Sequence, residues 1–586
     1  MTTKGKRKVW IWVGGILGGL ILIIGAAAVY LSTTWKPLLT EKLKEGVYTA
    51  SSKLYRLDFK DIHLNILTGS VVLDSLVLSP DTNVYNKLNA ERKASSHLFK
   101  IRVDFLKLSR IQVLTAYFDK EIKLNSIILT RPSIDMIYTK VPKKLDTPEV
   151  EKTLYEQISK SLRSVQVGSI KVIDADFDYY NGSKKLQSIK HLSINVSDIL
   201  VDSAAQFDNT RVLHAKNIGF ELKDYQSVTK DKMYTLKVDT VQGSINSKTL
   251  NVKGFKLIPM HTDLAFSRKY KEQKDRYDLD FNSISMSGVD FIQLSNEGTL
   301  YARHLKIGPA KVGVFLNREL PPPNFDKGRN FPHAALKRAP IQTTVDSLTL
   351  TGVDVAYTEY NPKNRERGTL KLNNLSGTIL NLTNDSVQLS KNSRALANLS
   401  TSLLGAAKLN VKINFNLTDP ASSFSYSGHM GPFNMKILNP LSKSLGEVEI
   451  ESGQVKEVNF DVNGHRNGSK GVVRFSYSDL KVKLLKEGED GKAEKKGLLS
   501  FLANTILIKN DNPTKGESLR TATISMERVP QASFFNLMWK SVFTGIREIV
   551  GIGIVPMKPM EKPGMSKKEE RQKKREARRA EQKKEG

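Results

Sequence analysis

At residues 347–355 the chain reads SLTLTGVDV. Apolar side chains occupy the second, fourth, seventh and ninth places of this stretch, so the alternation shifts its phase once, at the glycine. Apolar residues that recur with a period of two predict a β-strand with one apolar face. The shift of phase predicts a bulge or a tight turn in the middle of that strand.

The same pattern returns at three other places in the chain. Residues 169–177 read SIKVIDADF and residues 283–291 read SISMSGVDF, both with Asp at the eighth place, while residues 126–134 read SIILTRPSI, a looser copy. The copies are unevenly spaced, which argues against a solenoid of fixed period. We therefore expect one continuous antiparallel sheet that is extended by hairpins of variable length.

Other alternating runs predict further strands, and the chain is therefore expected to be mainly β. The clearest runs lie at residues 55–78, 99–107, 111–118, 122–130, 368–382, 409–417, 446–460 and 471–485. One helix is predicted to interrupt them near residues 147–163, where Thr147 is a suitable N-cap and Pro148 follows it. The apolar stripe of this helix consists of Val150, Leu154, Ile158 and Leu162.

Composition narrows the possible functions. The chain has 586 residues, a net charge of +30 and no cysteine, which excludes disulfides, cysteine-ligated metals and thiol nucleophiles. Its length exceeds that of one compact core, so several domains or one elongated structure are expected. The positive charge is spread along the chain, and both anionic lipid surfaces and nucleic acid would attract it.

The N-terminus decides between these two partners. Residues 9–31 hold no charged side chain, and as a helix they would be about 34 Å long, enough to cross a bilayer. The basic residues within 1–8 place that end in the cytoplasm by the positive-inside rule. Trp10, Trp12 and Trp35 are predicted to lie at the membrane interface. The bulk of the chain then lies across the membrane, away from nucleic acid. A cleaved signal peptide ending near residues 26–28 is the alternative interpretation.

The C-terminal part predicts an amphipathic helix at residues 531–555, followed by a flexible basic tail at 556–586. Phe535, Trp539 and Phe543 are the residues expected at a membrane interface. Two interpretations stay open: the helix packs on the last strands of the sheet, or it touches a membrane or an envelope partner.

No arrangement of residues predicts an enzyme. The sequence holds no HExxH, no phosphate-binding glycine loop and no G-x-S-x-G, and its nine histidines are scattered. Asp176, Asp290 and Asp354 recur at equivalent places, but each belongs to a separate copy of the pattern. We interpret them as solvent-facing strand or turn residues rather than as an acid/base pair, and we predict no catalytic residue, cofactor or metal.

Taken together, these segments resemble the AsmA-like family of bacterial envelope proteins. The resemblance rests on residues 55–78, 347–357 with 368–375, 471–484 and 534–548. It implies a single-pass anchor in the inner membrane and a long, curled antiparallel sheet in the periplasm, at residues 32–530. Family members are similar in architecture to chorein-type bridge proteins, whose apolar groove carries lipid acyl chains.

The expected function is therefore binding of phospholipid acyl chains, in lipid transport or envelope homeostasis between the inner and outer membranes. The candidate groove residues are Ile170, Val172, Phe177, Ile284, Met286, Phe291, Leu348, Leu350, Val353 and Val355. The alternative is a scaffold or assembly factor for outer-membrane proteins, with outer-membrane or envelope proteins as partners.

Overall fold

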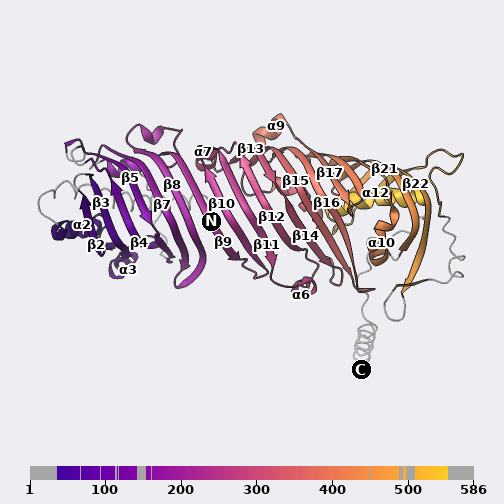
Figure 1. Cartoon of the computed structure of the whole chain (residues 1–586), viewed down its shortest axis with the longest axis horizontal. Helices are drawn as coiled ribbons and strands as arrows, with labels where there is room; N and C mark the ends of the chain where they lie inside the picture. Colours follow the sequence, from indigo (N-terminus) through magenta and orange to yellow (C-terminus); the bar gives the residue numbers. More distant parts are fainter. Residues whose placement is uncertain are drawn as a thin grey trace, which may run out of the picture.

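The computed structural model describes residues 36–551, apart from 66–67, 93, 113–114, 116–117, 141–152, 160–161, 447, 488–492 and 496–507. Its dominant feature is one long sheet of 24 strands, which cross the long axis of the molecule and broadly follow chain order from end to end (Figure 1). The chain is mainly β, as predicted.

The bounds of the elements are as follows. The strands are β1 (Tyr55–Asp58), β2 (Asp61–Asn65), β3 (Ser70–Pro80), β4 (His97–Ser109), β5 (Glu121–Thr130), β6 (Ser133–Tyr138), β7 (Ser164–Asn181), β8 (Lys184–Val201), β9 (Ala215–Val228), β10 (Tyr234–Ser244), β11 (Thr249–Pro259), β12 (Arg276–Ser287), β13 (Leu300–Ile307), β14 (Ala310–Asn317), β15 (Thr343–Asn361), β16 (Glu366–Thr383), β17 (Arg394–Leu403), β18 (Ala407–Asn416), β19 (Phe424–Met430), β20 (Phe433–Asn434), β21 (Val448–His465), β22 (Gly468–Glu487), β23 (Ala493–Lys495) and β24 (Thr521–Glu527). The α-helices are α2 (Lys36–Ala50), α3 (Thr82–Ala90), α5 (Leu154–Ile158), α6 (Asp263–Ser267), α7 (Phe291–Asn296), α8 (Pro332–Lys337), α9 (Ser386–Lys391), α10 (Asn439–Gly446) and α12 (Phe534–Val550), and the 3₁₀ helices are η1 (Ala205–Phe207), η2 (Lys327–Asn330) and η3 (Met435–Leu438).

The sheet is antiparallel except at two junctions, which corrects the expectation of a purely antiparallel sheet built from hairpins. β5 and β6 run parallel to β7, and β13 and β14 run parallel to β15. At each junction a connection of about 25 residues separates the strands, as a parallel crossover requires. The two junctions share one register, since Thr130 lies opposite Ile173 and Ile307 lies opposite Leu350, 43 positions apart in both cases.

A break in the strands accompanies each junction. Arg131-Pro132 separates β5 from β6, and Gly308-Pro309 separates β13 from β14, since proline has no N–H to donate to the ladder. Opposite these breaks, β7 and β15 are irregular at Asp174 and Gly352, where φ is 57° and 63°. The bulge that the sequence pattern predicts is therefore confirmed in both strands.

These irregular positions continue across the central strands as a line that we call the seam. The seam residues with positive φ are Asp174, His191, Asp224, Gly254, Gly308, Gly352 and Asn374. Glycine, Asn, Asp and His are the residue types that most often adopt this conformation. At the seam the apolar positions of a strand lie three residues apart, yet they stay on one face: Val172 and Phe177, on either side of it, pack against the same core.

Two local predictions need correction, at residues 283–291 and 111–118. The copy at 283–291 is not a strand throughout, because β12 ends at Ser287 and the chain turns at Gly288. Asp290 then caps α7 by accepting a hydrogen bond from the N–H of Gln293, so Phe291 begins a helix. The predicted strand at 111–118 is not one in its described residues, since the chain turns at Arg110, where φ is positive, and Asp119 N–H bonds to Thr115.

The predicted helix near 147–163 is seen as α5, whose N-cap is Thr153 in a capping box with Glu156. Its expected start at Thr147 lies outside the described residues. The predicted membrane span at 9–31 and the tail at 556–586 also lie outside them. No helix in the described part of the chain is long and apolar enough to cross a membrane.

From its place in the seam, we predict that Gly352 is required because of its backbone conformation, and not because a larger side chain would lack room. A Cβ at Gly352 would meet no atom closer than 3.8 Å, and one at Gly431 none closer than 3.9 Å, but only Gly352 has a positive φ. We expect Gly352→Ala to lower the free energy of unfolding by about 1–2 kcal/mol and Gly431→Ala by less than about 0.5 kcal/mol. Urea denaturation of both variants measures this, and equal effects would contradict the role of the seam.

Candidate functional site: an uncovered apolar face

One register row of the sheet is apolar from its first strand to its last. In this row, row A, each residue lies directly opposite the next in the strand ladder. Row A consists of Ile62, Leu73, Leu106, Leu129, Val172, Ile194, Phe220, Gly243, Leu250, Met286, Leu305, Leu348, Ile379, Ala397, Ile413, Tyr426, Val462, Gly471 and Ile524. No charged side chain occurs in it.

A second apolar row, row B, runs beside row A from β7 to β24. Row B consists of Ala175, Leu192, Leu222, Val241, Val252, Ile284, Ile307, Leu350, Gly377, Leu399, Val411, Gly428, Phe460, Val473 and Ala522. The row between them along the strands is polar: Ser193, Glu221, Gln242, Asn251, Ser285, Lys306, Thr349, Thr378, Asn398, Lys412, Ser427 and Asp461. Successive side chains point to opposite sides of a strand, so rows A and B form one apolar face.

Two of the four glycines in these rows are filled in by an aromatic ring of the neighbouring strand. Gly243 lies opposite Phe220, and Gly428 lies opposite Phe460. In both places the aromatic ring occupies the space that a Cβ on the glycine would fill. The ring of the neighbouring strand thus supplies the apolar surface that the glycine lacks.

Burial divides the apolar face into three parts. At the N-terminal end it is covered, with Leu73 only 1% exposed, and at the C-terminal end Val462 is 0% exposed. Between them, every large side chain of row A from Val172 to Leu305, and of row B from Leu192 to Ile307, is only half-buried. We call this middle part, from β7 to β13, the open stretch.

Helix α2 contributes to the cover at the N-terminal end. Leu43 and Val47 on α2 are buried in one core with Leu57, Leu73 and Leu106. The sheet below is therefore an ordinary protein core at this end, and its apolar face is not available to a ligand.

Helix α12 covers the C-terminal end, where it lies across the strands (Figure 1). It begins at the N-cap Ser533 and ends at Gly551, whose φ of 84° is the left-handed conformation typical of a helix C-terminus. Tyr426 of row A donates a hydrogen bond to the carbonyl of Met538 at 3.0 Å. A Cβ on Gly545 would lie only 2.8 Å from the side chain of Val473 in row B, so the helix touches the sheet closely.

The connection at residues 318–342, which we call the strap, packs against α12. The ring of Phe331 lies 5.4 Å from Phe534 and 5.9 Å from Phe424. Arg528 pairs with Asp326 of the strap and also donates to the carbonyl of Ala532, just before the helix. The strap and α12 therefore close this end as one packed unit.

A small charged cluster lies where β14 and β15 end. Arg318 pairs with Glu359 at 3.2 Å, and the Tyr357 hydroxyl donates to the same carboxylate at 3.0 Å. Burial, with the charge of Glu359, raises the pKa of Tyr357, and burial raises the pKa of Asp275. Burial and the nearby Arg318 lower the pKa of Lys540 on α12. This cluster places α12 close to the end of β15.

The structure brings most of the predicted groove residues together. Those that lie in row A or row B are Val172, Met286, Leu348, Ile284 and Leu350. Ile170 and Phe177 pack against the same core as Val172, and Val353 and Val355 continue β15 beyond the seam. Phe291, in α7, is the one that lies outside the sheet.

The predicted interface residues and aspartates are placed differently. Phe535, Trp539 and Phe543 are exposed on α12, while Trp10, Trp12 and Trp35 lie outside the described residues. Asp176, Asp290 and Asp354 are kept apart, in β7, before α7 and in β15. Within the described ranges, no group of three or more His, Asp or Glu side chains is arranged to hold a metal ion.

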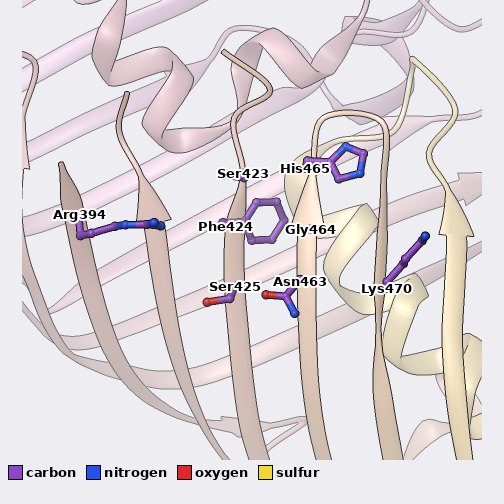
Figure 2. Close-up of a pocket in the computed structure, with 8 residues that line it drawn as sticks. All are labelled: Arg394, Ser423, Phe424, Ser425, Asn463, Gly464, His465 and Lys470. Atoms are coloured by element: carbon purple, nitrogen blue, oxygen red, sulfur yellow. The ribbon is translucent and has the colours of Figure 1, made fainter. Parts of the chain in front are cut away.

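One hollow of about 350 Å³ lies away from the open stretch. Figure 2 shows Arg394 and Lys470 at its two sides, with Ser425 and Asn463 between them. Ser425, Asn463 and Lys470 are paired across the strands in a polar row, so this hollow belongs largely to the polar face. It does not continue the apolar face.

Comparison with known proteins does not identify the site. No family model, no curated protein and no solved structure matches this chain. The candidate site is therefore identified from the geometry of the open stretch alone.

The cover at the C-terminal end is predicted to weaken at acidic pH. His333 on the strap is buried among Phe331, Phe415 and Phe424, and neither ring nitrogen has a hydrogen-bond partner among the described residues. Burial lowers the pKa of His333, although the nearby backbone of Ser422 and the charge of Asp419 act in the opposite sense. Between the lowered pKa and the ordinary value of about 6.5, the unfolded chain binds more protons, so stability falls as the pH drops below about 6.5.

We expect His333→Leu to reduce this loss of stability, measured as unfolding midpoints between about pH 7 and pH 5. The exposed His429 offers the control, and His429→Leu should keep the pH dependence of the unchanged chain. The same pH dependence in both variants would contradict the prediction.

Proposed function

We propose that the open stretch binds the acyl chains of membrane lipids and shields them from water. The observation that carries this proposal is the partial exposure of two continuous apolar rows over seven neighbouring strands, whose large side chains are half-buried. A contiguous apolar surface that stays partly exposed over this extent is typical of a binding site. Removing it from water contributes roughly 25 cal/mol per Å².

The dimensions suit this ligand. Strands lie about 4.8 Å apart, so the distance from β7 to β13 is roughly 30 Å. The hydrocarbon core of a bilayer, which holds two layers of acyl chains, is about as thick. An extended acyl chain therefore fits along rows A and B, while a polar headgroup remains in solvent.

The proposal extends to the cellular setting. The resemblance to the AsmA-like family, the predicted span at 9–31 and the basic charge support a single-pass protein of a bacterial inner membrane with its sheet in the periplasm. In that setting the open stretch would hold phospholipid in transit between the inner and outer membranes. Because α2 and α12 cover the two ends, lipid would enter the open stretch from its side.

Photo-crosslinking from neighbouring residues of β15 tests the proposal. Leu350 borders the open stretch: it belongs to row B, lies directly opposite Ile307 and is itself half-buried, while Thr349 belongs to the polar row on the other face. We expect benzoylphenylalanine at position 350 to form lipid adducts in cells and the same group at position 349 to form few or none, as read by mass spectrometry.

Two results would contradict the proposal. One is the absence of lipid adducts at position 350, and the other is an equal yield at both positions. Protein adducts at position 350 would instead favour the assembly factor for outer-membrane proteins.

A further inference from the structure

Helix α12 is apolar on two sides, and only one of these sides packs against the sheet. Phe534, Leu537, Ser541 and Gly545 face the sheet and are buried. On the opposite side Phe535, Trp539 and Phe543 follow one another at intervals of four residues, and they are 70%, 48% and 39% exposed. We call these three residues the aromatic stripe.

The aromatic stripe is not needed to hold the helix in place. The packing of α12 is already supplied by its buried side, by the hydrogen bond from Tyr426 and by the contact between Ser541 and Ser469 at 2.6 Å. The rings of Trp539 and Phe543 lie 5.0 Å apart and form one continuous surface. A surface helix normally carries polar side chains at such positions, so three exposed rings indicate a partner.

The charge around the stripe indicates the chemistry of that partner. Arg547 lies in the last turn of α12, and two basic residues adjoin that end: the backbone N–H of Lys509 bonds to the carbonyl of Val550, and Arg520, which also pairs with Glu517, donates to that of Ile549. From there the chain leads into residues 566–586, which contain ten Lys or Arg and five Glu. Aromatic rings beside basic side chains are typical of a segment that lies in the interface of an anionic bilayer.

We propose that the aromatic stripe inserts into the surface of an anionic lipid bilayer and docks the C-terminal end of the sheet there. The helix stays packed on the apolar face while its outer side enters the headgroup region. The aromatic stripe is separate from the open stretch, because it lies on the outer side of α12, whereas the buried side of α12 packs on the C-terminal end of the sheet. The proposal therefore stands or fails independently of lipid binding in the open stretch.

The absence of cysteine from the chain allows a direct test. In the full chain, Phe543→Cys is labelled with an environment-sensitive nitrobenzoxadiazole group, and vesicles of phosphatidylcholine with or without phosphatidylglycerol are added. The control is the same label at Phe207→Cys in η1, where the native side chain is 76% exposed. The label reports its own surroundings, so anchoring of the chain elsewhere does not produce the signal.

We expect a blue shift of the emission at position 543 with vesicles that contain phosphatidylglycerol, and none at position 207. Added salt should weaken the response, and Phe535→Ser with Trp539→Ser should raise the lipid concentration needed for it roughly tenfold or more. The proposal is overturned by no shift at position 543, by an equal shift at position 207 or with neutral vesicles, or by an emission already blue-shifted before vesicles are added. Lipid extracted from the same preparation reports separately on the open stretch.

Discussion

Register is the constraint on which the rest of this structure depends. Side chains alternate between the faces of a strand, so a slip of one residue in any ladder would move the apolar residues of every later strand to the other face. Rows A and B remain apolar through two parallel junctions and a line of irregular residues. The seam keeps these rows in register, because each irregular strand accommodates its one extra residue at the same position along the ladder as its neighbours do. Gly308-Pro309 and Gly352, side by side, are the clearest example.

The sequence was sufficient to predict the local part of this account. The positions of Leu348, Leu350, Val353 and Val355 on one face follow from the period of two and its shift at Gly352, both of which are visible within nine residues. The prediction that residues 283–291 form one strand was wrong, because the sequence Gly288-Val289-Asp290 is compatible both with a strand that has a bulge and with a turn that caps a helix. Only the chain that follows, which packs Phe291 against the cluster of Val289, Ala302 and Val345, distinguishes the two.

The long-range part could not be read from the sequence. Parallel pairing of β5 with β7 and of β13 with β15 depends on where a connection of about 25 residues returns, and no local pattern records that. The covering of the two ends of the apolar face could not be predicted for a similar reason. Phe534 and Phe535 are adjacent and chemically identical, yet one is buried against Phe424 and the other is exposed. Which of them faces the sheet is decided by α12 docking on β22 and β24.

The molecule is a sheet with one apolar face, closed at both ends and open between them. Lipid binding by this open part is tested most directly by measuring the lipid that the full chain retains after mild purification, by mass spectrometry. We predict bound phospholipid in the unchanged chain and in Asn195→Lys with Asn251→Lys on the polar face. It should be lost in Ile194→Lys with Leu250→Lys, which place the same charges in row A. No bound lipid in the unchanged chain, or equal lipid in the two double variants, would contradict the account.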